Sequence, residues 1–420
     1  MKVQPEALAK SNTCMTQLLE KPDLQTALNP ILEEVIRFRR EIHAHPCLSA
    51  DEQDTADRIV EWLEKNAPPT EVVTHLGGTG IAAFYDSGKA GPTVMLRSEL
   101  DALPLNDHDE IEHKSRRPGI AHKCGHDGHA ATLCAVAYLL SQHPMPVGRA
   151  VLHWQPAEET GEGARAVLAD PNFEMLGIDW AFSWHNVPGY PLGEACYKAG
   201  PFAPASVGLE VELIGQHSHA GEPHNGLNPA LTVAQVVQTL TGLPAVLGGM
   251  YQHGLVTPNT ILMGNRDFGI SPSNALLGFT LRSETDEGLE RLVKAARERT
   301  SLITEAWGGE VEFIERDPFA ATINWLEGVE VVKNAVEQCE TPHRSLEHGF
   351  SWSEDFGEFI RRVPGANFAI GSGVDHPPLH SYTYDFPDQL VKVAAPLFYT
   401  VAWNAVQTEP PAKRSDSGHQ

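Results

Sequence analysis

Short apolar runs that end in polar residues recur through the first half of the chain. Residues 93–96, 151–154 and 180–184 are such runs, each short enough for a buried strand. The residues that follow them carry carboxylate or imidazole groups: Glu99, Asp101, Glu158, Glu159 and His185. Because the carboxyl ends of strands in an α/β sheet meet at one edge, we expect these side chains to surround one pocket.

Two segments of the same half have the pattern of helices. Residues 130–140 are almost entirely apolar, which predicts a buried helix. Ser49 and Glu52 have the spacing of a capping box, and Ile59, Trp62 and Leu63 then follow a helical repeat. The second segment therefore predicts an amphipathic helix that starts at this box.

The pattern changes after residue 204. Val207, Leu209, Val211 and Leu213 alternate with polar residues, as in a half-buried strand. The elements predicted next are a helix opened by Asn228-Pro229, strands at 256–263 and 275–282, a helix over 289–303 closed by Gly308-Gly309, and a strand from Val311. The order β-α-β-β-α-β is that of a ferredoxin-like α+β unit.

This order predicts two domains, of which one is discontinuous. Residues 205–316 are predicted to form the inserted ferredoxin-like domain. Mixed helix and strand patterns resume after it, so residues 1–204 and 317–420 are predicted to form one α/β catalytic, metal-binding domain with a mixed sheet flanked by helices.

Composition narrows the class of partner and the compartment. The formal charge of -24 argues against nucleic acid or an anionic membrane as the main partner. Residues 1–30 lack the continuous apolar core of a secretory signal. The six cysteines are scattered without the spacing of a disulfide framework, so we expect a cytoplasmic protein.

The richest chemistry lies in residues 122–129, which read HKCGHDGH. Cys124 and His126 stand two apart, and Gly125 between them permits a turn that aims both side chains at one metal ion. The positive end of the following helix would oppose a cation, so further anionic ligands must come from elsewhere. His122 and His129 are expected to be packing residues or to support the ligands.

The adjacent carboxylates Glu158 and Glu159 predict a division of roles. Neighbouring residues in a non-helical segment point apart, so one can bind metal while the other acts as a general base. The full set of candidate ligands is Cys124, His126, Glu159, His185 and His380, enough for two ions that share a water. Thiolate and imidazole favour zinc, and manganese, cobalt and nickel are compatible.

Three histidines lie in residues 215–224 of the inserted domain. They could form a separate metal site or be surface residues. The favoured interpretation is that one of them, His219, reaches the pocket and polarises a scissile carbonyl. Asn274 and Arg282 lie beside a strand of this domain and could bind a substrate carboxylate, although a structural role is equally open.

Motifs along residues 30–405 closely resemble one family of metallopeptidases, the di-metal amidohydrolases that include aminoacylases, hippurate hydrolase and auxin-conjugate (IAA-amino acid) hydrolases. The matching stretches, in order, are Arg39-Arg40 with residues 43–46, RSELDALP at 97–104, HKCGHDGH at 122–129, QPAEETG at 155–161, Trp184-His185, the stretch around His219, SEDF at 353–356 and Leu379-His380.

The resemblance implies a zinc-peptidase-like catalytic domain with an inserted lid or dimerisation domain. We expect a homodimer or other homo-oligomer, with a tetramer and a monomer as the open alternatives. The resemblance also implies that a metal-activated water cleaves the amide bond of N-acyl amino acids. Carried over by position, the residues that resemble the ligands of two divalent ions are Cys124, His126, Glu159, His185 and His380. Glu158 is similar to the general base, Asp101 to an acid that orients a ligand, and His219 to a lid histidine that stabilises the oxyanion.

The chain departs from the family pattern at a few positions. Glu99 stands where the family usually has Asp, Cys47 where it has Glu, and residues 275–277 lack an expected isoleucine-proline pattern. None of these changes removes a proposed ligand. The alternatives are a dipeptidase or carboxypeptidase with the same site and, from another class, a non-catalytic metal-binding or ligand-binding protein.

Overall fold

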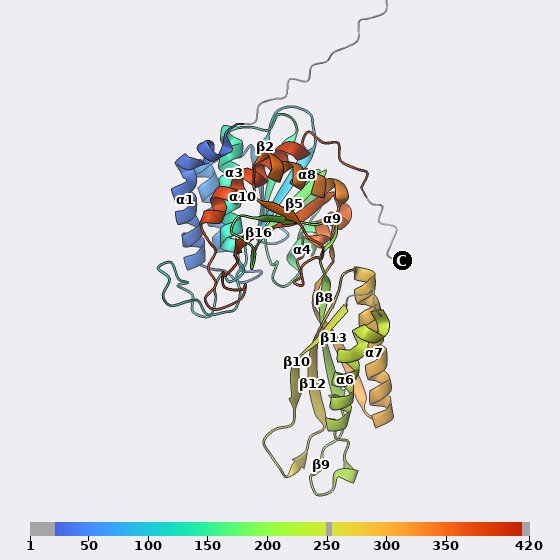
Figure 1. Ribbon diagram of the computed structural model, residues 1–420. Helices are drawn as coiled ribbons and strands as arrows, with labels where there is room; N and C mark the ends of the chain where they lie inside the picture. The colour runs from blue at the N-terminus through green and yellow to red at the C-terminus, as the bar shows by residue number, and fades with distance from the viewer. Residues whose placement is uncertain (1–21, 249–253, 414–420) are drawn as a thin grey trace, which may run out of the picture.

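The computed structural model describes residues 22–248 and 254–413. The structure has two units (Figure 1): an eight-stranded sheet covered by helices lies at the top of the view, and a four-stranded sheet with two helices lies below it. Residues 1–21 and 414–420, which the sequence assigns to the catalytic domain, lie outside the described residues.

The eight-stranded unit is built on a mixed sheet, as predicted. Its strands, in spatial order, are β1 (Glu71–Leu76), β2 (Gly80–Asp86), β4 (Arg149–Gln155), β3 (Thr93–Glu99), β5 (Trp180–Pro188), β16 (Gly365–Gly373), β6 (Ala195–Tyr197) and β15 (His343–Ser345). The central pairs β4–β3, β3–β5 and β5–β16 are parallel. Their carboxyl ends therefore open on the same edge of the sheet.

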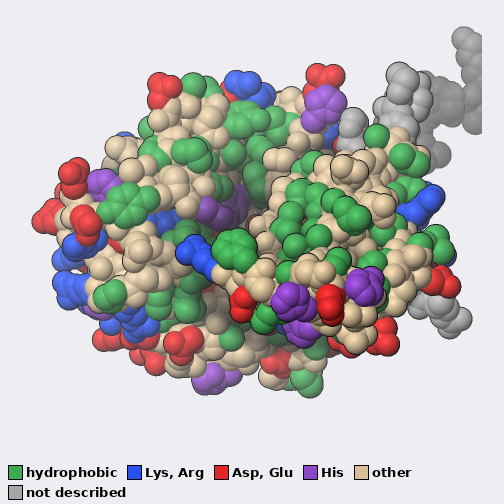
Figure 2. Space-filling view, turned by 90° about the horizontal axis from the view of Figure 1, so that it is seen from below, with side chains coloured by type: hydrophobic (Ala, Val, Ile, Leu, Met, Phe, Trp, Pro, Cys, Tyr) green, Lys and Arg blue, Asp and Glu red, His purple; other side chains and the backbone are tan. Residues whose placement is uncertain are grey.

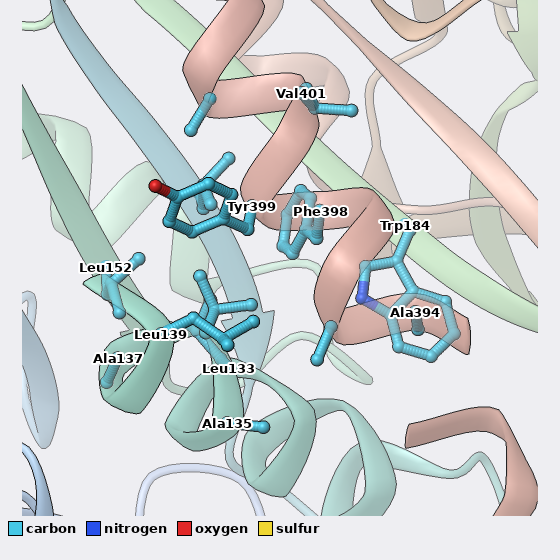
Figure 3. Close-up of a cluster of buried hydrophobic side chains, with 14 of the residues drawn as sticks. Leu133, Ala135, Ala137, Leu139, Leu152, Trp184, Ala394, Phe398, Tyr399 and Val401 are labelled. Atoms are coloured by element: carbon cyan, nitrogen blue, oxygen red, sulfur yellow. The ribbon is translucent and has the colours of Figure 1, made fainter. Parts of the chain in front are cut away.

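Helices cover both faces of this sheet. One face carries α1 (Leu24–Ala44), α2 (Gln53–Asn66), α3 (His126–Gln142), α8 (Leu326–Gln338) and α10 (Gln389–Ala405), and the other carries α4 (Gly163–Ala169), α5 (Pro171–Leu176) and α9 (Gly357–Arg362). In Figure 3, Leu133 and Leu139 of α3 lie between that helix and Phe398 of α10. The predicted buried helix is confirmed, and it begins at His126, inside the HKCGHDGH stretch that holds the candidate metal ligands.

The four-stranded unit comprises residues 205–319. Its strands are β10 (Gly254–Met263), β12 (Asn274–Ser283), β8 (Ala205–Ile214) and β13 (Glu310–Phe319) in spatial order, and every neighbouring pair is antiparallel. Val207, Leu209, Val211 and Leu213 are buried in a hydrophobic cluster of this unit's own. The predicted β-α-β-β-α-β order is present, with helices α6 (Ala230–Gly248) and α7 (Asp286–Trp307).

Short elements lie at the two ends of the four-stranded unit. At its far tip are β9 (Ser218–His219), β11 (Ile270–Ser271) and a 3-10 turn at Pro223–Asn225 (Figure 1). At the junction, β7 (Gly200–Ala203) pairs with β14 (Thr322–Asn324). The strands of this unit begin at Ala205 and end at Phe319, close to the predicted limits of 205 and 316, but the division into domains stays a prediction.

Helix α6 is the one helix of the described residues that is long and apolar enough to cross a membrane. The window Ala230–Leu247 has a mean hydropathy of 1.5, and only 28% of it is buried. Its buried residues Val236, Leu240 and Leu243 belong to the hydrophobic cluster of the four-stranded sheet. The helix therefore packs as a sheet-covering helix that leaves apolar side chains on its outer face.

Candidate metal centre

The predicted site forms at the carboxyl ends of the three central strands. Glu99 is the last residue of β3, Glu158 and Glu159 follow β4, and His185 lies near the end of β5. These strands are neighbours in the parallel part of the sheet. The expectation that their polar ends meet in one place is confirmed.

A glycine turn delivers Cys124 and His126 to the same place. Gly125 has φ of 98°, in the left-handed region, and a Cβ on it would lie 2.3 Å from Asn186 Oδ1. Both the backbone angle and the lack of space therefore require glycine. The turn allows the residues on either side of it to face the strand ends.

The five predicted ligands lie together. Donor atoms of Cys124, His126 and His185 are all within 4.8 Å of one another, as are those of Cys124, Glu159 and His380. Cys124 Sγ is 3.4 Å from His185 Nε2, and Glu159 lies between two imidazoles, with Oε1 3.9 Å from His126 Nε2 and Oε2 3.8 Å from His380 Nε2.

Unsatisfied buried atoms show that this donor set suits a cation. His126 Nε2 and Glu159 Oε1 are buried and have no hydrogen-bond partner, and their separation is too long for a hydrogen bond. Zinc bonds of about 2.0–2.3 Å place two tetrahedral ligands roughly 3.3–3.8 Å apart. The two atoms are therefore spaced much as two ligands of one ion are.

The charges of the cluster favour the same interpretation. Burial, together with Glu159 and Glu158, raises the pKa of Cys124 well above its usual value, and burial raises the pKa of Glu159 to about 7. Burial also lowers the pKa of His185, which keeps its imidazole neutral, the form that binds metal. The anionic forms of Cys124 and Glu159 are therefore disfavoured in the pocket alone, and a divalent ion would stabilise them.

Asp101 fixes the orientation of one candidate ligand. His126 Nδ1 lies 2.9 Å from the Asp101 carbonyl oxygen and 3.2 Å from its Oδ1, which leaves Nε2 facing the cluster. Asp101 Oδ2 in turn accepts hydrogen bonds from Glu159 N and Ser49 Oγ. Burial opposes ionisation of Asp101, but these hydrogen bonds lower its pKa overall.

A buried ion network lies beneath Glu158. Arg97 donates to Asp355 Oδ1 at 2.5 Å, pairs with Glu99, and lies 3.0 Å from Glu354 Oε1. The Asp355 backbone N–H donates to Glu158 Oε1 at 3.4 Å. Burial and the charge of Glu354 raise the pKa of Glu158 well above its usual value.

Residue-by-residue reasoning missed this network. Arg97, Glu354 and Asp355 occur in the RSELDALP and SEDF stretches, whose resemblance to a family was the only available signal. No local spacing points to them, because Arg97 and Asp355 are 258 residues apart in the sequence.

The two other histidines of the HKCGHDGH stretch lie differently. His129 is bonded at both ring nitrogens, to Glu99 Oε2 at 2.7 Å and to Asn186 Oδ1 at 2.6 Å. His122 is buried, has no hydrogen-bond partner at either nitrogen, and burial lowers its pKa to about 4. This geometry agrees with the expectation that both are packing residues or support the ligands.

The three predicted residues of the inserted segment are not brought to the cluster together. His219 is exposed in β9, at the tip of the four-stranded unit remote from the eight-stranded sheet (Figure 1). Asn274 pairs with Ile214 at the tip end of β12, whereas Arg282 pairs with Ser206 at the junction end. Eight residues of strand span roughly 26 Å, so Asn274 and Arg282 of one chain cannot bind the same small carboxylate.

Seen from below, the molecule is hollowed between its two units. Figure 2 shows histidine side chains deep in this hollow and a basic side chain at its edge. Arg282 contributes to the junction, where its Nη1 donates to Ser353 Oγ at 2.5 Å.

Comparisons with known proteins agree with this geometry. A family model described as Peptidase family M20/M25/M40 matches residues 95–403. The chain is 29% identical over 387 residues to thermostable carboxypeptidase 1 of Saccharolobus solfataricus, covering 90% of this chain and 96% of that protein. It is 28% identical over 376 residues to hippurate hydrolase of Campylobacter jejuni, covering 88% and 96% respectively.

A solved structure has the same fold. A dinuclear metal binding peptidase of the M20 family from Bacillus subtilis superposes with a TM-score of 0.76 at 24% identity, covering 90% of this chain and 99% of that chain. The matched family model spans more than half of the 420 residues, and the chain therefore belongs to the peptidase family M20/M25/M40.

Proposed function

We propose that this protein is a metal-dependent amidohydrolase that cleaves the amide bond of N-acyl amino acids. The observation that carries the proposal is the cluster of five donors, of which Cys124, His126 and His185 are buried, with the further carboxylate of Glu158 beside it. The relative named hippurate hydrolase supports the same class of substrate.

Two divalent ions are the proposed cofactors, held by Cys124, His126, Glu159, His185 and His380. Thiolate and imidazole donors favour zinc, while manganese, cobalt or nickel would also suit a mixed site. When bound, the ions would polarise the substrate carbonyl and make water easier to deprotonate. The dinuclear metal binding peptidase from Bacillus subtilis supports the number of two.

Glu158 is the proposed general base. Its Oε2 lies 3.7 Å from His126 Nε2, so the carboxylate borders the donor cluster. It would take a proton from the attacking water and later give it to the leaving amine nitrogen as the carbon–nitrogen bond breaks. Burial and the nearby Glu354 raise its pKa, which suits a group that must both accept and release a proton.

Asp101 would act on the reaction only through His126, by holding the ring with Nε2 toward the donors. Such an orienting partner fixes the tautomer of a metal-binding imidazole. Arg97 and Asp355 would play the same indirect part for Glu158, since Asp355 N donates to its carboxylate.

A homodimer is the proposed assembly, with His219 acting on the pocket of the second copy. Leu231 and Val246 of α6 are 80% and 75% exposed, and Leu262 on the edge strand β10 is 61% exposed. An apolar helix face beside a free strand edge is a surface that a second copy would cover. A second copy would also explain why His219 is remote from the cluster of its own chain.

In such a dimer the substrate carboxylate would meet residues from two chains. Asn274 lies at the same tip as His219 and would come from the second copy, whereas Arg282 would act from the junction of the first. We further propose a cytoplasmic location, which the free thiols of Cys47, Cys124, Cys134 and Cys196 support.

A carboxypeptidase is the second candidate, favoured by the relative of that name. It would use the same metal cluster and base, and the two candidates differ in whether the group on the amide carbonyl is an acyl chain or an amino acid with a free amine.

The deciding experiment combines elemental analysis with a substrate panel. Release of amino acid from N-acetyl and N-benzoyl amino acids and from matched dipeptides is followed before and after chelation. We expect about two metals per chain and hydrolysis of N-acyl amino acids that chelation abolishes. Preference for dipeptides would favour the carboxypeptidase, and a protein with two metals and no hydrolysis of either series would refute the proposal.

A further inference from the structure

An aromatic cluster adjoins the candidate ligand His185. The Trp352 ring lies 5.2 Å from the His185 ring between centroids, at 41°. Phe350 stacks on Trp352 at 4.9 Å and 23°, and Phe202 meets both rings edge-on. These rings come from two segments of the chain that are about 150 residues apart and meet beside the donor cluster.

The cluster has a rigid base and an accessible surface. Phe202 is fully buried, whereas Trp352 and Phe350 are only half-buried. Phe202 and Phe350 therefore pack against Trp352, and part of the Trp352 ring stays accessible to a ligand. Half-exposed stacked aromatic side chains beside a pocket are surfaces on which a flat apolar group can bind.

The chain around Trp352 is fixed on both sides. The next residue, Ser353, donates to Pro204 O at 2.8 Å and accepts from Arg282. Glu354 and Asp355 are buried with Arg97 beneath Glu158. Trp352 thus stands between the proposed base and the junction of the two units, and it contacts the imidazole whose Nε2 faces Cys124.

The chemistry of this surface suits one half of the proposed substrate. A carboxylate binds best to a cation, and the rings of Trp352 and Phe350 carry no charge; the indole N–H of Trp352 is their one hydrogen-bond donor. Arg344 lies over Tyr190, a neighbour of Phe350, and is paired with Glu194. The amino acid carboxylate is better served by the guanidinium of Arg282, proposed above as its partner, which leaves the apolar faces of the rings to the acyl group.

We propose that Trp352, backed by Phe350, binds the acyl group of the substrate and selects aromatic acyl groups over small ones such as acetyl. This inference rests on the proposed amidohydrolase function and adds a specificity-determining residue to it.

The test compares N-benzoyl and N-acetyl derivatives of the same amino acid. The kcat/KM ratio of the two is measured for the metal-loaded wild type, Trp352→Ala and Trp352→Phe, with Phe313→Ala as the control, a half-buried aromatic residue of β13. We expect a wild-type ratio of at least about 10 that falls roughly tenfold in Trp352→Ala, chiefly through KM, and is largely kept in Trp352→Phe and Phe313→Ala.

A binding measurement separates failure of the inference from failure of the function. Calorimetry with Glu158→Gln compares N-benzoyl and N-acetyl binding with and without Trp352→Ala. Tighter benzoyl binding that depends on Trp352 would support the inference even if no turnover is found. An unchanged benzoyl-to-acetyl ratio in Trp352→Ala, in turnover or in binding, would overturn the inference while leaving the amidohydrolase function intact.

Discussion

The edge of the eight-stranded sheet and the tip of the four-stranded unit both carry histidines that the sequence assigns to catalysis, but they present them differently. At the sheet edge, His126 and His185 are buried and meet donors from other segments within 4.8 Å. At the tip, His219 is exposed, and its ring accepts a hydrogen bond from Gly221 N, two residues away.

The difference indicates which part of the active site one chain builds alone. Parallel strand ends and a buried helix start hold four of the candidate metal ligands and Glu158 within one chain. His219 is exposed at the tip, so in the proposed mechanism it would need a second surface before it could act. Changes at the sheet edge should therefore act within one chain, and changes at the tip should depend on the partner.

The largest effect is expected at the sheet edge, from Glu158→Gln. The amide has the shape of the carboxylate but cannot take a proton, so kcat should fall by about 10²–10⁴-fold. Metal content should stay at the wild-type level, because the five donors remain. The control is Glu64→Gln, on the exposed face of α2, and near-normal turnover of Glu158→Gln would exclude the base assignment.

A second change at the sheet edge tests the buried network. Arg97→Met leaves Glu99, Glu354 and Asp355 buried without their cation, which should cost about 3–5 kcal/mol of unfolding free energy. Tryptophan fluorescence can follow the unfolding of the eight-stranded unit, because seven of the eight tryptophans lie outside residues 205–319 and only Trp307 lies within them. An unchanged urea midpoint would mean that the network contributes nothing to stability.

The tip is tested by His219→Ala. Loss of an oxyanion-stabilising group should lower kcat by about 10²–10³-fold, with no change in the unfolding midpoint because the side chain is exposed. Mixing this variant with Glu158→Gln then tests whether His219 acts on the pocket of a second copy. If His219 acts across a dimer, mixed dimers contain one intact site and regain activity, whereas mixtures that stay inactive would assign His219 to its own chain or to no role.

The sequence could predict the sheet edge because local patterns determine it. Apolar runs predict the strands, and the residues at the ends of neighbouring parallel strands must lie at one edge of the sheet. The proximity of Glu159 and His185 could therefore be predicted from the sequence alone. The helix start at Gln53 shows the limit. Glu52 was expected to complete a capping box, but its carboxylate accepts from Ala157 N, far along the chain, and Ser49 donates to Asp101.

Longer-range relations could not be predicted in this way. The β-α-β-β-α-β order gives the topology of the four-stranded unit, yet it does not say which end of the sheet adjoins the metal cluster. That orientation places Arg282 at the junction and Asn274 and His219 at the tip. Likewise, nothing local to Arg97 indicates that its partners are Glu354 and Asp355.

A smaller effect, again within the eight-stranded unit, concerns pH. Burial opposes protonation of His43, but Asp127 and Asp107 raise its pKa to about 9. The folded pKa exceeds the unfolded value, so this stabilisation is complete below about pH 6.5 and is lost as the pH rises through 9. The difference in unfolding free energy between wild type and His43→Gln should therefore shrink by roughly 3 kcal/mol from pH 6 to pH 10. A difference that stays constant over this range would exclude a charged His43.

The smallest effect is expected in the four-stranded unit, from Arg297→Ala. Arg297 Nη1 lies 2.8 Å from Glu315 Oε1, but the two side chains are 46% and 44% exposed, and the guanidinium also lies over Phe313. Water and salt screen such a pair, so its loss should cost less than about 1 kcal/mol, and less again at high ionic strength. Calorimetric unfolding of Arg297→Ala beside Arg97→Met measures both on one scale. If Arg297→Ala were as destabilising as Arg97→Met, burial would not be what distinguishes the ion pairs of the two units. The contrast between the buried sheet edge of the eight-stranded unit and the exposed side chains of the four-stranded unit would then have no basis in free energy.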